Sequence, residues 1–161
     1  VTTGAGDDQV NTFAGSDVIS TGAGDDTVYA TSVGDKVVDL GVGQDTFVFS
    51  AKGDSTVTVT GQSGYPNGGN TYQVNGSNDD GTLVITDFDW TEMQGNNVLD
   101  TGYDFLVLDG VSINNENQLD SFINGNADYS ASVQGADLHI VDTSLDGTTT
   151  IVLEDAAGFW M

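Results

Sequence analysis

The sequence predicts an all-β protein with a repetitive N-terminal part and a β-rich C-terminal part that contains one short helix. A nine-residue frame of glycine, aspartate and an apolar residue recurs five times before residue 51. After it, seven short runs rich in β-branched and aromatic residues are separated by turn residues, as in strands joined by loops. We therefore predict two units, residues 1–50 and residues 51–161.

The repeat is recognised from two positions that recur in phase. Segments 3–8 and 21–26 both read Thr-Gly-Ala-Gly-Asp-Asp, and frames at 12–20, 30–38 and 40–48 keep the pattern with substitutions, the last after one inserted residue, Asp39. The sixth position of the five frames is Asp8, Asp17, Asp26, Asp35 and Asp45, and the eighth is Val10, Ile19, Val28, Val37 and Phe47. Such phase-locked repetition is typical of proteins built from one repeated structural unit.

Each frame has a physical interpretation. Glycines at the second and fourth positions permit backbone angles that a Cβ atom disfavours, so carbonyl oxygens can turn towards a common centre. The aspartate adds a carboxylate, which completes a set of hard oxygen ligands of the kind that Ca²⁺ prefers. The next three residues form a short strand whose middle side chain points into a core. One frame is then half of a flattened coil, and two frames complete a turn.

These frames resemble the repeats-in-toxin (RTX) family, whose nonapeptide repeats bind Ca²⁺. The resemblance implies a parallel β-roll, a form of β-solenoid, with several ions held between neighbouring loops. Thr3, Thr12, Thr21, Ala30 and Leu40 stand at the first glycine of the family pattern, where the backbone carbonyl is the expected ligand. The expected metal-binding residues are Thr3, Gly4, Ala5, Gly6, Asp8, Thr21, Gly22, Ala23, Gly24, Asp26, Gly41, Gly43 and Asp45, together with Asp17, Asp35 and Asp87. The competing interpretation is a set of surface turns without metal, and for Asp87 a solvated turn carboxylate.

Alternate frames are expected to lie on opposite edges of the coil. Frames one, three and five carry Asp8, Asp26 and Asp45 on what we call the odd edge, and frames two and four carry Asp17 and Asp35 on the even edge. The odd edge keeps its paired glycines, whereas Phe13, Thr31 and Val33 replace glycine on the even edge. We predict two good ion sites on the odd edge and one weakened or missing site on the even edge.

The C-terminal part is expected to cover the apolar end of the coil. Strands are predicted at 55–60, 71–75, 82–88, 104–109, 129–133, 137–142 and 148–153, with turns at Asn75-Gly76, Gln134-Gly135 and Asp146-Gly147. Asn114 or Asn115 could cap a helix over 116–123 that buries Leu119, Phe122 and Ile123. Residues 102–106 match only the second half of the frame, so no further repeat is predicted.

A second resemblance concerns the same region. Segments 45–50, 84–88 and 104–109 are similar to the sequence that follows the last repeats in type I secreted proteases, lipases and alginate epimerases. The resemblance implies a capping segment that carries an uncleaved type I secretion signal, and the ending 153–161 is similar to such signals. Because Val1 opens in mid-pattern without an initiator methionine, the chain is expected to be a fragment of a larger secreted protein.

Composition excludes several classes of function. The 25 acidic residues, 22 of them Asp, face two lysines and no arginine, giving a net charge of −23. Such a chain neither neutralises a nucleic-acid backbone nor binds an anionic membrane surface. No cysteine is present, which excludes disulfides and thiol catalysis. His139 is the only histidine, and no catalytic motif accompanies it, so we expect a monomer without enzymatic activity of its own.

Two functions remain. The first is a Ca²⁺-binding module that folds outside the cell and supports the secretion and folding of an N-terminal effector, such as an enzyme or adhesin. The second is a polysaccharide-binding accessory module, like the repeat modules of alginate epimerases. The net charge disfavours uronate polymers, because only Lys36 and Lys52 could attract a polyanion. Binding to a glycan array in the presence of calcium separates the two.

Overall fold

Two β-sheets make up most of the protein. The computed structural model describes residues 1–161 except 51–52, 63–68, 76–80, 91–102, 145–146 and 157–161. Within these residues, the first ten strands are β1 (Thr2–Ala5), β2 (Gln9–Asn11), β3 (Asp17–Ala23), β4 (Thr27–Ala30), β5 (Lys36–Asp39), β6 (Thr46–Phe49), β7 (Ser55–Thr60), β8 (Thr71–Val74), β9 (Gly81–Ile85) and β10 (Phe105–Leu108). The remaining elements are β11 (Val111–Ile113), the helix α1 (Glu116–Gly125), β12 (Tyr129–Gln134), β13 (Asp137–Asp142) and β14 (Thr149–Leu153). The predicted all-β class is confirmed.

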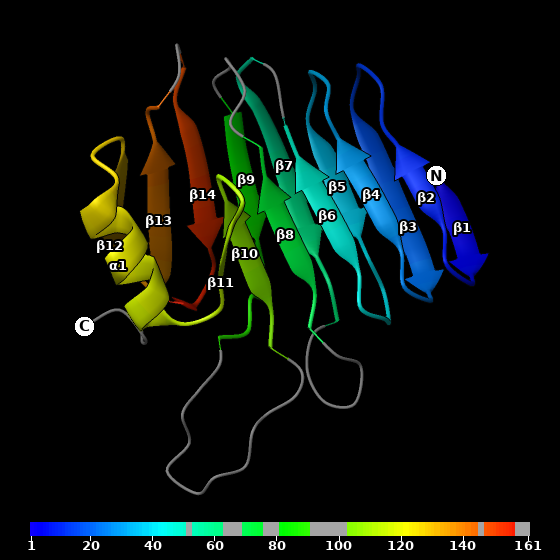
Figure 1. Ribbon diagram of the computed structural model, residues 1–161. Helices are drawn as coiled ribbons and strands as arrows, with labels where there is room; N and C mark the ends of the chain where they lie inside the picture. Colours follow the sequence, from blue (N-terminus) through cyan, green and yellow to red (C-terminus); the bar gives the residue numbers. More distant parts are fainter. Residues whose placement is uncertain (51–52, 63–68, 76–80, 91–102, 145–146, 157–161) are drawn as a thin grey trace, which may run out of the picture.

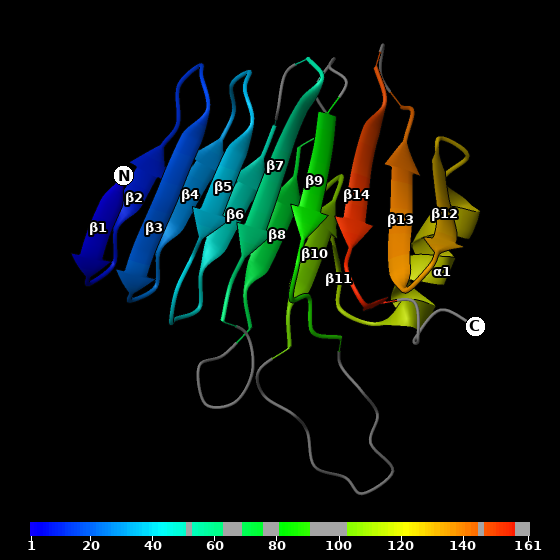
Figure 2. The same ribbon diagram turned by 180° about the vertical axis from the view of Figure 1, so that it is seen from behind.

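From β1 to β10, consecutive strands alternate between the two sheets. The eight-stranded sheet has the order β1-β3-β5-β7-β9-β14-β13-β12, and the six-stranded sheet has the order β11-β10-β8-β6-β4-β2. Up to β10, every neighbouring pair within a sheet is parallel. We call one passage through a strand of each sheet a winding, so β1 and β2 form the first winding and β9 and β10 the fifth. Figures 1 and 2 show the two sheets from opposite sides.

The loops between the sheets form two edges. Those that follow β1, β3 and β5 carry Asp8, Asp26 and Asp45, which makes this the odd edge; it lies at the bottom of Figure 1. The loops that lead from β2, β4 and β6 back to the eight-stranded sheet form the even edge at the top. The strand pairing continues past residue 50, because β7 pairs with β5 and β8 pairs with β6.

The fourth frame has a different register from the predicted one. Asp17 pairs with Lys36, and Ile19 pairs with Val38. Val38 is accordingly buried at 1% exposure, whereas Val37 is 54% exposed, so the assignment of Val37 to the inward position is wrong. The assignment of Asp39 as an inserted residue is also wrong, because Asp39 pairs with Ser20 inside β5. The extra residue lies between Tyr29 and Lys36, since Tyr29 pairs with Asn11 one winding earlier.

A single hydrophobic core fills the space between the sheets. It is built from inward-facing side chains at alternate strand positions, such as Val57 and Val59 of β7 and Leu83 and Ile85 of β9. The same cluster includes Leu119 and Phe122 of α1. Because period-two alternation places these apolar residues on one face, the strands follow from the sequence pattern directly.

The C-terminal elements depart from the alternating pattern. β11 is antiparallel to β10, and β12, β13 and β14 form antiparallel pairs, while β14 lies parallel to β9. Asn115 caps α1 by accepting the Gln118 N–H (3.0 Å), which confirms one of the two predicted caps. The predicted turn at Gln134-Gly135 agrees with the antiparallel pairing of β12 and β13, whereas the predicted turn at Asp146-Gly147 lies partly outside the described residues. The one helix among the described residues is too short and too polar to cross a bilayer.

Candidate metal centre

Glycines shape the loops of the odd edge. Gly22 has a φ of +108°, and a Cβ atom there would overlap the backbone carbonyl of Gly4 in the winding before it. Gly41 meets Gly22 in the same way. Only glycine allows both the positive φ and this close approach of stacked backbones. The loops of the odd edge therefore stack with their carbonyl groups in successive layers.

The sixth-position side chains of the odd edge form a hydrogen-bonded ladder. The N–H of Asp8 donates to Oδ1 of Asp26 (2.8 Å), and the N–H of Asp26 donates to Oδ1 of Asp45 (2.8 Å). The ladder continues from Asp45 N–H to Oδ1 of Asn70 (2.9 Å) and from Asn70 N–H to Oδ1 of Asp104 (2.6 Å). We call these five residues the carboxylate ladder. It brings together the predicted Asp8, Asp26 and Asp45 and adds two residues that were not predicted.

Two oxygen atoms of the carboxylate ladder are buried without a hydrogen-bond partner. Asp26 and Asp45 are each 1% exposed, and each uses Oδ1 to accept a backbone N–H. Their Oδ2 atoms contact no donor among the described residues. An ionised carboxylate in this situation is costly, because burial removes water and nothing replaces it. A cation beside Oδ2 would remove that cost.

The raised pKa values of two ladder carboxyls also favour a cation at this edge. The pKa of Asp45 is raised to about 6, chiefly by burial; the Asp26 N–H lowers it, and the carboxylates of Asp26 and Asp25 contribute to the rise. Burial raises the pKa of Asp104 to about 7, although the N–H groups of Asp89 and Asn70 lower it. Ionising either carboxyl is therefore harder than ionising an exposed aspartate, and a positive charge nearby would favour the ionised form.

Other predicted ligands lie on the same windings as the first three residues of the ladder. Gly4 and Ala5 of β1 pair with Gly22 and Ala23 of β3, so the first two odd-edge loops are in register. The predicted residues Thr3 and Thr21 lie on the first two of these windings, and Gly6, Gly24, Gly41 and Gly43 lie in the three stacked loops. The hydroxyl of Thr3 donates to the carbonyl of Thr21 (2.8 Å), and that of Thr21 donates to the carbonyl of Leu40 (2.6 Å). A carbonyl oxygen has two lone pairs, so each can still accept a further contact.

Asp87 lies at the same edge, near the far end of the ladder. Its two carboxylate oxygens both accept the N–H of Gly61 (3.1 Å each). Burial raises its pKa, and its charge raises the pKa of Asp104. The structure therefore brings Asp87 to the odd edge, beside Asp104.

The even edge is different. Asp17 contacts Lys36 (3.5 Å), while Asp35 is exposed and accepts the Thr56 N–H (2.9 Å). The structure thus does not stack Asp17 on Asp35. Gly34, with a φ of +111°, stacks on Gly15, so Val33 does not stand at a glycine position as predicted.

Asn70 and Asp104 were missed because the complete frame is absent around them. The signal was present in half-frames: Asn70-Thr-Tyr-Gln-Val and Asp104-Phe-Leu-Val-Leu match Asp45-Thr-Phe-Val-Phe from the sixth position onwards. Tyr72 and Leu106 then take the inward place of Phe47 in the six-stranded sheet.

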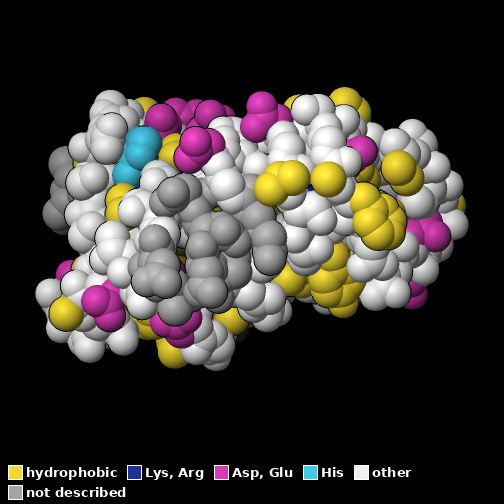
Figure 3. All heavy atoms as spheres, turned by 90° about the horizontal axis from the view of Figure 1, so that it is seen from above, with side chains coloured by type: hydrophobic (Ala, Val, Ile, Leu, Met, Phe, Trp, Pro, Cys, Tyr) yellow, Lys and Arg dark blue, Asp and Glu magenta, His cyan; other side chains and the backbone are white. Residues whose placement is uncertain are grey.

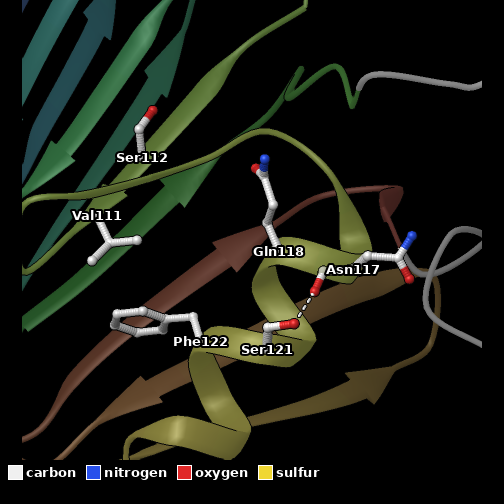
Figure 4. Close-up of a pocket in the computed structure, with 6 residues that line it drawn as sticks. All are labelled: Val111, Ser112, Asn117, Gln118, Ser121 and Phe122. Atoms are coloured by element: carbon white, nitrogen blue, oxygen red, sulfur yellow. Dashed lines mark hydrogen bonds between the residues drawn. The ribbon is translucent and has the colours of Figure 1, made fainter.

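A shallow pocket of about 490 Å³ lies between β11 and α1. It is lined by Val111, Ser112, Asn117, Gln118, Ser121 and Phe122, and the Ser121 hydroxyl donates to the Asn117 carbonyl (2.7 Å; Figure 4). None of these six side chains ionises near neutral pH, so the pocket offers no general acid or base. The carboxylate ladder is the stronger candidate site.

An ion on the odd edge would depend on backbone oxygens. No group of three or more acidic or histidine side chains within the described residues lies close enough to hold a metal. Stacked loop carbonyls and single carboxylates from Asp26 and Asp45 would be hard oxygen ligands, the class that Ca²⁺ prefers. Comparisons with models of protein families and with curated proteins found no match.

Proposed function

We propose that this chain is a Ca²⁺-binding module of the repeats-in-toxin type, which folds on binding calcium outside the cell. In this proposal its alternating windings are a parallel β-roll, and it supports the secretion and folding of an effector that lies N-terminal to it. The observation that carries the proposal is the pair of buried, partnerless Oδ2 atoms of Asp26 and Asp45.

A cation accounts for this pair better than protonation does. At neutral pH a protonated ladder would require both buried carboxyls to stay neutral, and burial raises the pKa of Asp45 only to about 6. A divalent ion instead offsets part of the net charge of −23. Calcium suits the site more than magnesium, since Mg²⁺ dehydrates reluctantly and demands near-octahedral geometry.

Weak calcium binding would make folding depend on whether the chain is inside or outside the cell. Extracellular calcium modules bind with dissociation constants of roughly 10⁻⁴–10⁻³ M, far above cytosolic calcium. At ten times the dissociation constant, each site that exists only in the folded state adds about 1.4 kcal/mol to its stability. Several such sites together would shift the folding equilibrium from the disordered to the folded state when the chain reaches the higher calcium concentration outside the cell.

The test is a calcium titration followed by circular dichroism and isothermal titration calorimetry. We expect a disordered spectrum in chelator, a cooperative gain of β-structure with calcium, and several bound ions per chain. Magnesium at the same concentration serves as the control and should induce much less structure. Identical spectra in chelator and in excess calcium would contradict the proposal.

A further inference from the structure

The even edge holds a buried lysine. Lys36, the first residue of β5, is 1% exposed, and its ammonium donates to the carbonyl oxygens of Phe13 (3.3 Å), Gly15 (2.9 Å) and Gly34 (3.2 Å). Its charge faces the Asp17 carboxylate at 3.5 Å. Figure 3 looks onto this edge and shows hydrophobic side chains at the surface but no lysine among the described residues.

The register puts this lysine at a carboxylate position. Lys36 pairs with Asp17 of the preceding winding on the even edge. Asp26 lies next to Asp8 of the preceding winding in the same way on the odd edge. Phe13 and Gly15 hold the second and fourth places of their frame, which Gly4 and Gly6 hold in theirs. The oxygens around the ammonium therefore come from the frame positions expected to face an ion.

The contacts satisfy a cation completely. An ammonium has three N–H donors and no acceptor, and three carbonyl oxygens receive them. A buried charge is tolerated when it is both hydrogen-bonded and paired, as here with Asp17. Three carbonyls and one carboxylate from two successive loops are also hard oxygen ligands of the class that binds Ca²⁺, whose ligands lie at roughly 2.3–2.6 Å.

We propose that the Lys36 ammonium is the resident cation of the even edge, bound covalently to the chain in the place of a divalent ion. In this proposal the even edge is held together without metal, and this part does not depend on the function proposed above. The assignment of ion binding to the odd edge does rest on that function.

The first comparison is between Lys36→Met and Lys52→Met in the full chain, in saturating calcium. Each removes one positive charge, but only Lys36→Met leaves the oxygens of Phe13, Gly15, Gly34 and Asp17 without their cation. We expect Lys36→Met to lower the midpoint of thermal unfolding by about 10 °C, because the three carbonyl oxygens that accept from the ammonium lose their donor. Lys52→Met should shift it much less. Equal shifts would overturn the proposal.

A second comparison separates a cation site from general packing. Lys36→Ala empties the space, and methylammonium should restore the unfolding midpoint, whereas tetramethylammonium, which has no N–H donor, should not. Lys36→Asp should create a site for a divalent ion and raise the calcium stoichiometry by one ion relative to wild type. The proposal is overturned if methylammonium does not rescue Lys36→Ala and Lys36→Asp takes up no additional ion.

The two proposals fail in different ways. A wild-type chain that binds no calcium and folds in chelator would overturn the function proposed above. The loss of stability in Lys36→Met and its rescue in Lys36→Ala would still be measurable in that chain, because neither readout needs calcium.

Discussion

Asp26 and Asp17 occupy the same position of the repeat but have different surroundings. Asp26 is buried between Asp8 and Asp45 in the carboxylate ladder, with one oxygen bonded to the Asp8 N–H and the other without a partner. Asp17 is partly exposed and faces the ammonium of Lys36. The charge of Asp26 therefore calls for an added cation, whereas that of Asp17 already has one.

We predict that Asp26→Asn and Asp17→Asn affect calcium-dependent folding differently. Asp26→Asn keeps an oxygen for the Asp8 N–H, as Asn70 does naturally for Asp45, but removes the charge. The calcium midpoint for folding should rise by roughly tenfold or more, and the titration should become less steep. Asp17→Asn should shift the midpoint less and leave the steepness unchanged. Circular dichroism at a series of calcium concentrations measures both; equal changes in the two variants would contradict this assignment.

The residue scale also shows where sequence reasoning fails. The five aspartates in phase identified the odd edge, and the structure stacks three of them as expected. On the even edge, Asp35 matched the frame by counting, but one extra residue after Tyr29 places Lys36 there instead. Counting with a fixed nine-residue period does not detect this insertion, because Asp35 stands next to Lys36 and fits the expected aspartate position.

At the scale of elements, the loops of the odd edge depend on glycine for two separate reasons. Gly4 has a φ of +131°, and a Cβ atom there would meet nothing within 4 Å. Gly22 has a similar φ, but a Cβ atom would also overlap the Gly4 carbonyl. Replacing glycine in the first loop would thus cost only the free energy of a positive φ in a residue with a Cβ atom. In the second loop the same replacement would also cost the free energy of separating the stacked backbones.

Alanine at these two positions should separate the two costs. Gly4→Ala should lower the free energy of unfolding by about 1–2 kcal/mol, the cost of a left-handed backbone for an L-residue. Gly22→Ala should lower it by at least about 2 kcal/mol more, because stacked backbones have to move apart. Urea unfolding in saturating calcium gives both values. A loss of the same size in both variants would mean that the loops do not stack as described.

The helix α1 offers an independent test far from the ladder. Asn115 accepts the Gln118 N–H (3.0 Å), and the Gln118 side chain in turn accepts the Asn114 N–H (2.9 Å). Asn115→Ala should cost about 1 kcal/mol, the usual worth of an N-cap, and lower the unfolding midpoint by roughly 3 °C. Ser121→Ala, within the same helix, is the control and should change stability by less than about 0.5 kcal/mol. The calcium midpoint should hardly respond to either variant.

At the scale of the whole molecule, buried carboxyls link stability to pH. The pKa of Asp104 is raised from 3.8 to about 7, and that of Asp45 from 3.8 to about 6, chiefly by burial. A raised pKa means that the folded chain binds these protons more tightly than the unfolded chain does. Their contribution to stability is therefore full below about pH 4 and is lost as the pH rises through about 6 and 7.

In chelator, the chain should accordingly be more stable at pH 5 than at pH 8. Asp104 alone accounts for a difference of up to about 4 kcal/mol over its whole titration range. The gain of β-structure by circular dichroism at pH 5, relative to pH 6, 7 and 8, measures this in chelator, and Asp45→Asn should flatten the part of the profile below about pH 6. Excess calcium should remove most of the slope near neutral pH. A profile in chelator that rises from pH 5 to pH 8 would show that these carboxyls are ionised without cost.

Much of the fold could be predicted from period-two alternation, because strands over 55–60, 71–74, 81–85 and 137–142 follow directly from it. The frame did not predict that the winding continues past residue 50, since the loops before Asn70 and Asp104 are long and lack the paired glycines. Strand pairing is fixed by inward side chains, which Tyr72 and Leu106 supply, and not by loop length. The predicted boundary after residue 50 and the secretion signal at 153–161 stay predictions.

The carboxylate ladder has a direction, and that direction bears on the order in which the windings form. Every link joins an amide to a side chain of the following winding, 18 to 34 residues later in the chain. Asp104, at the far end, is already held by the amide of Asp89 (3.0 Å) and borders the antiparallel C-terminal strands. The ladder thus gives each winding an acceptor in the winding that follows it, whereas the links that run the opposite way, from the Asp25 N–H to Asp7 and from the Gln44 N–H to Asp25, are exposed. We therefore expect folding to proceed winding by winding from the C-terminal end towards the N-terminus. The folding rate would then be set by nucleation in the C-terminal windings and not by the regular repeats of residues 1–50.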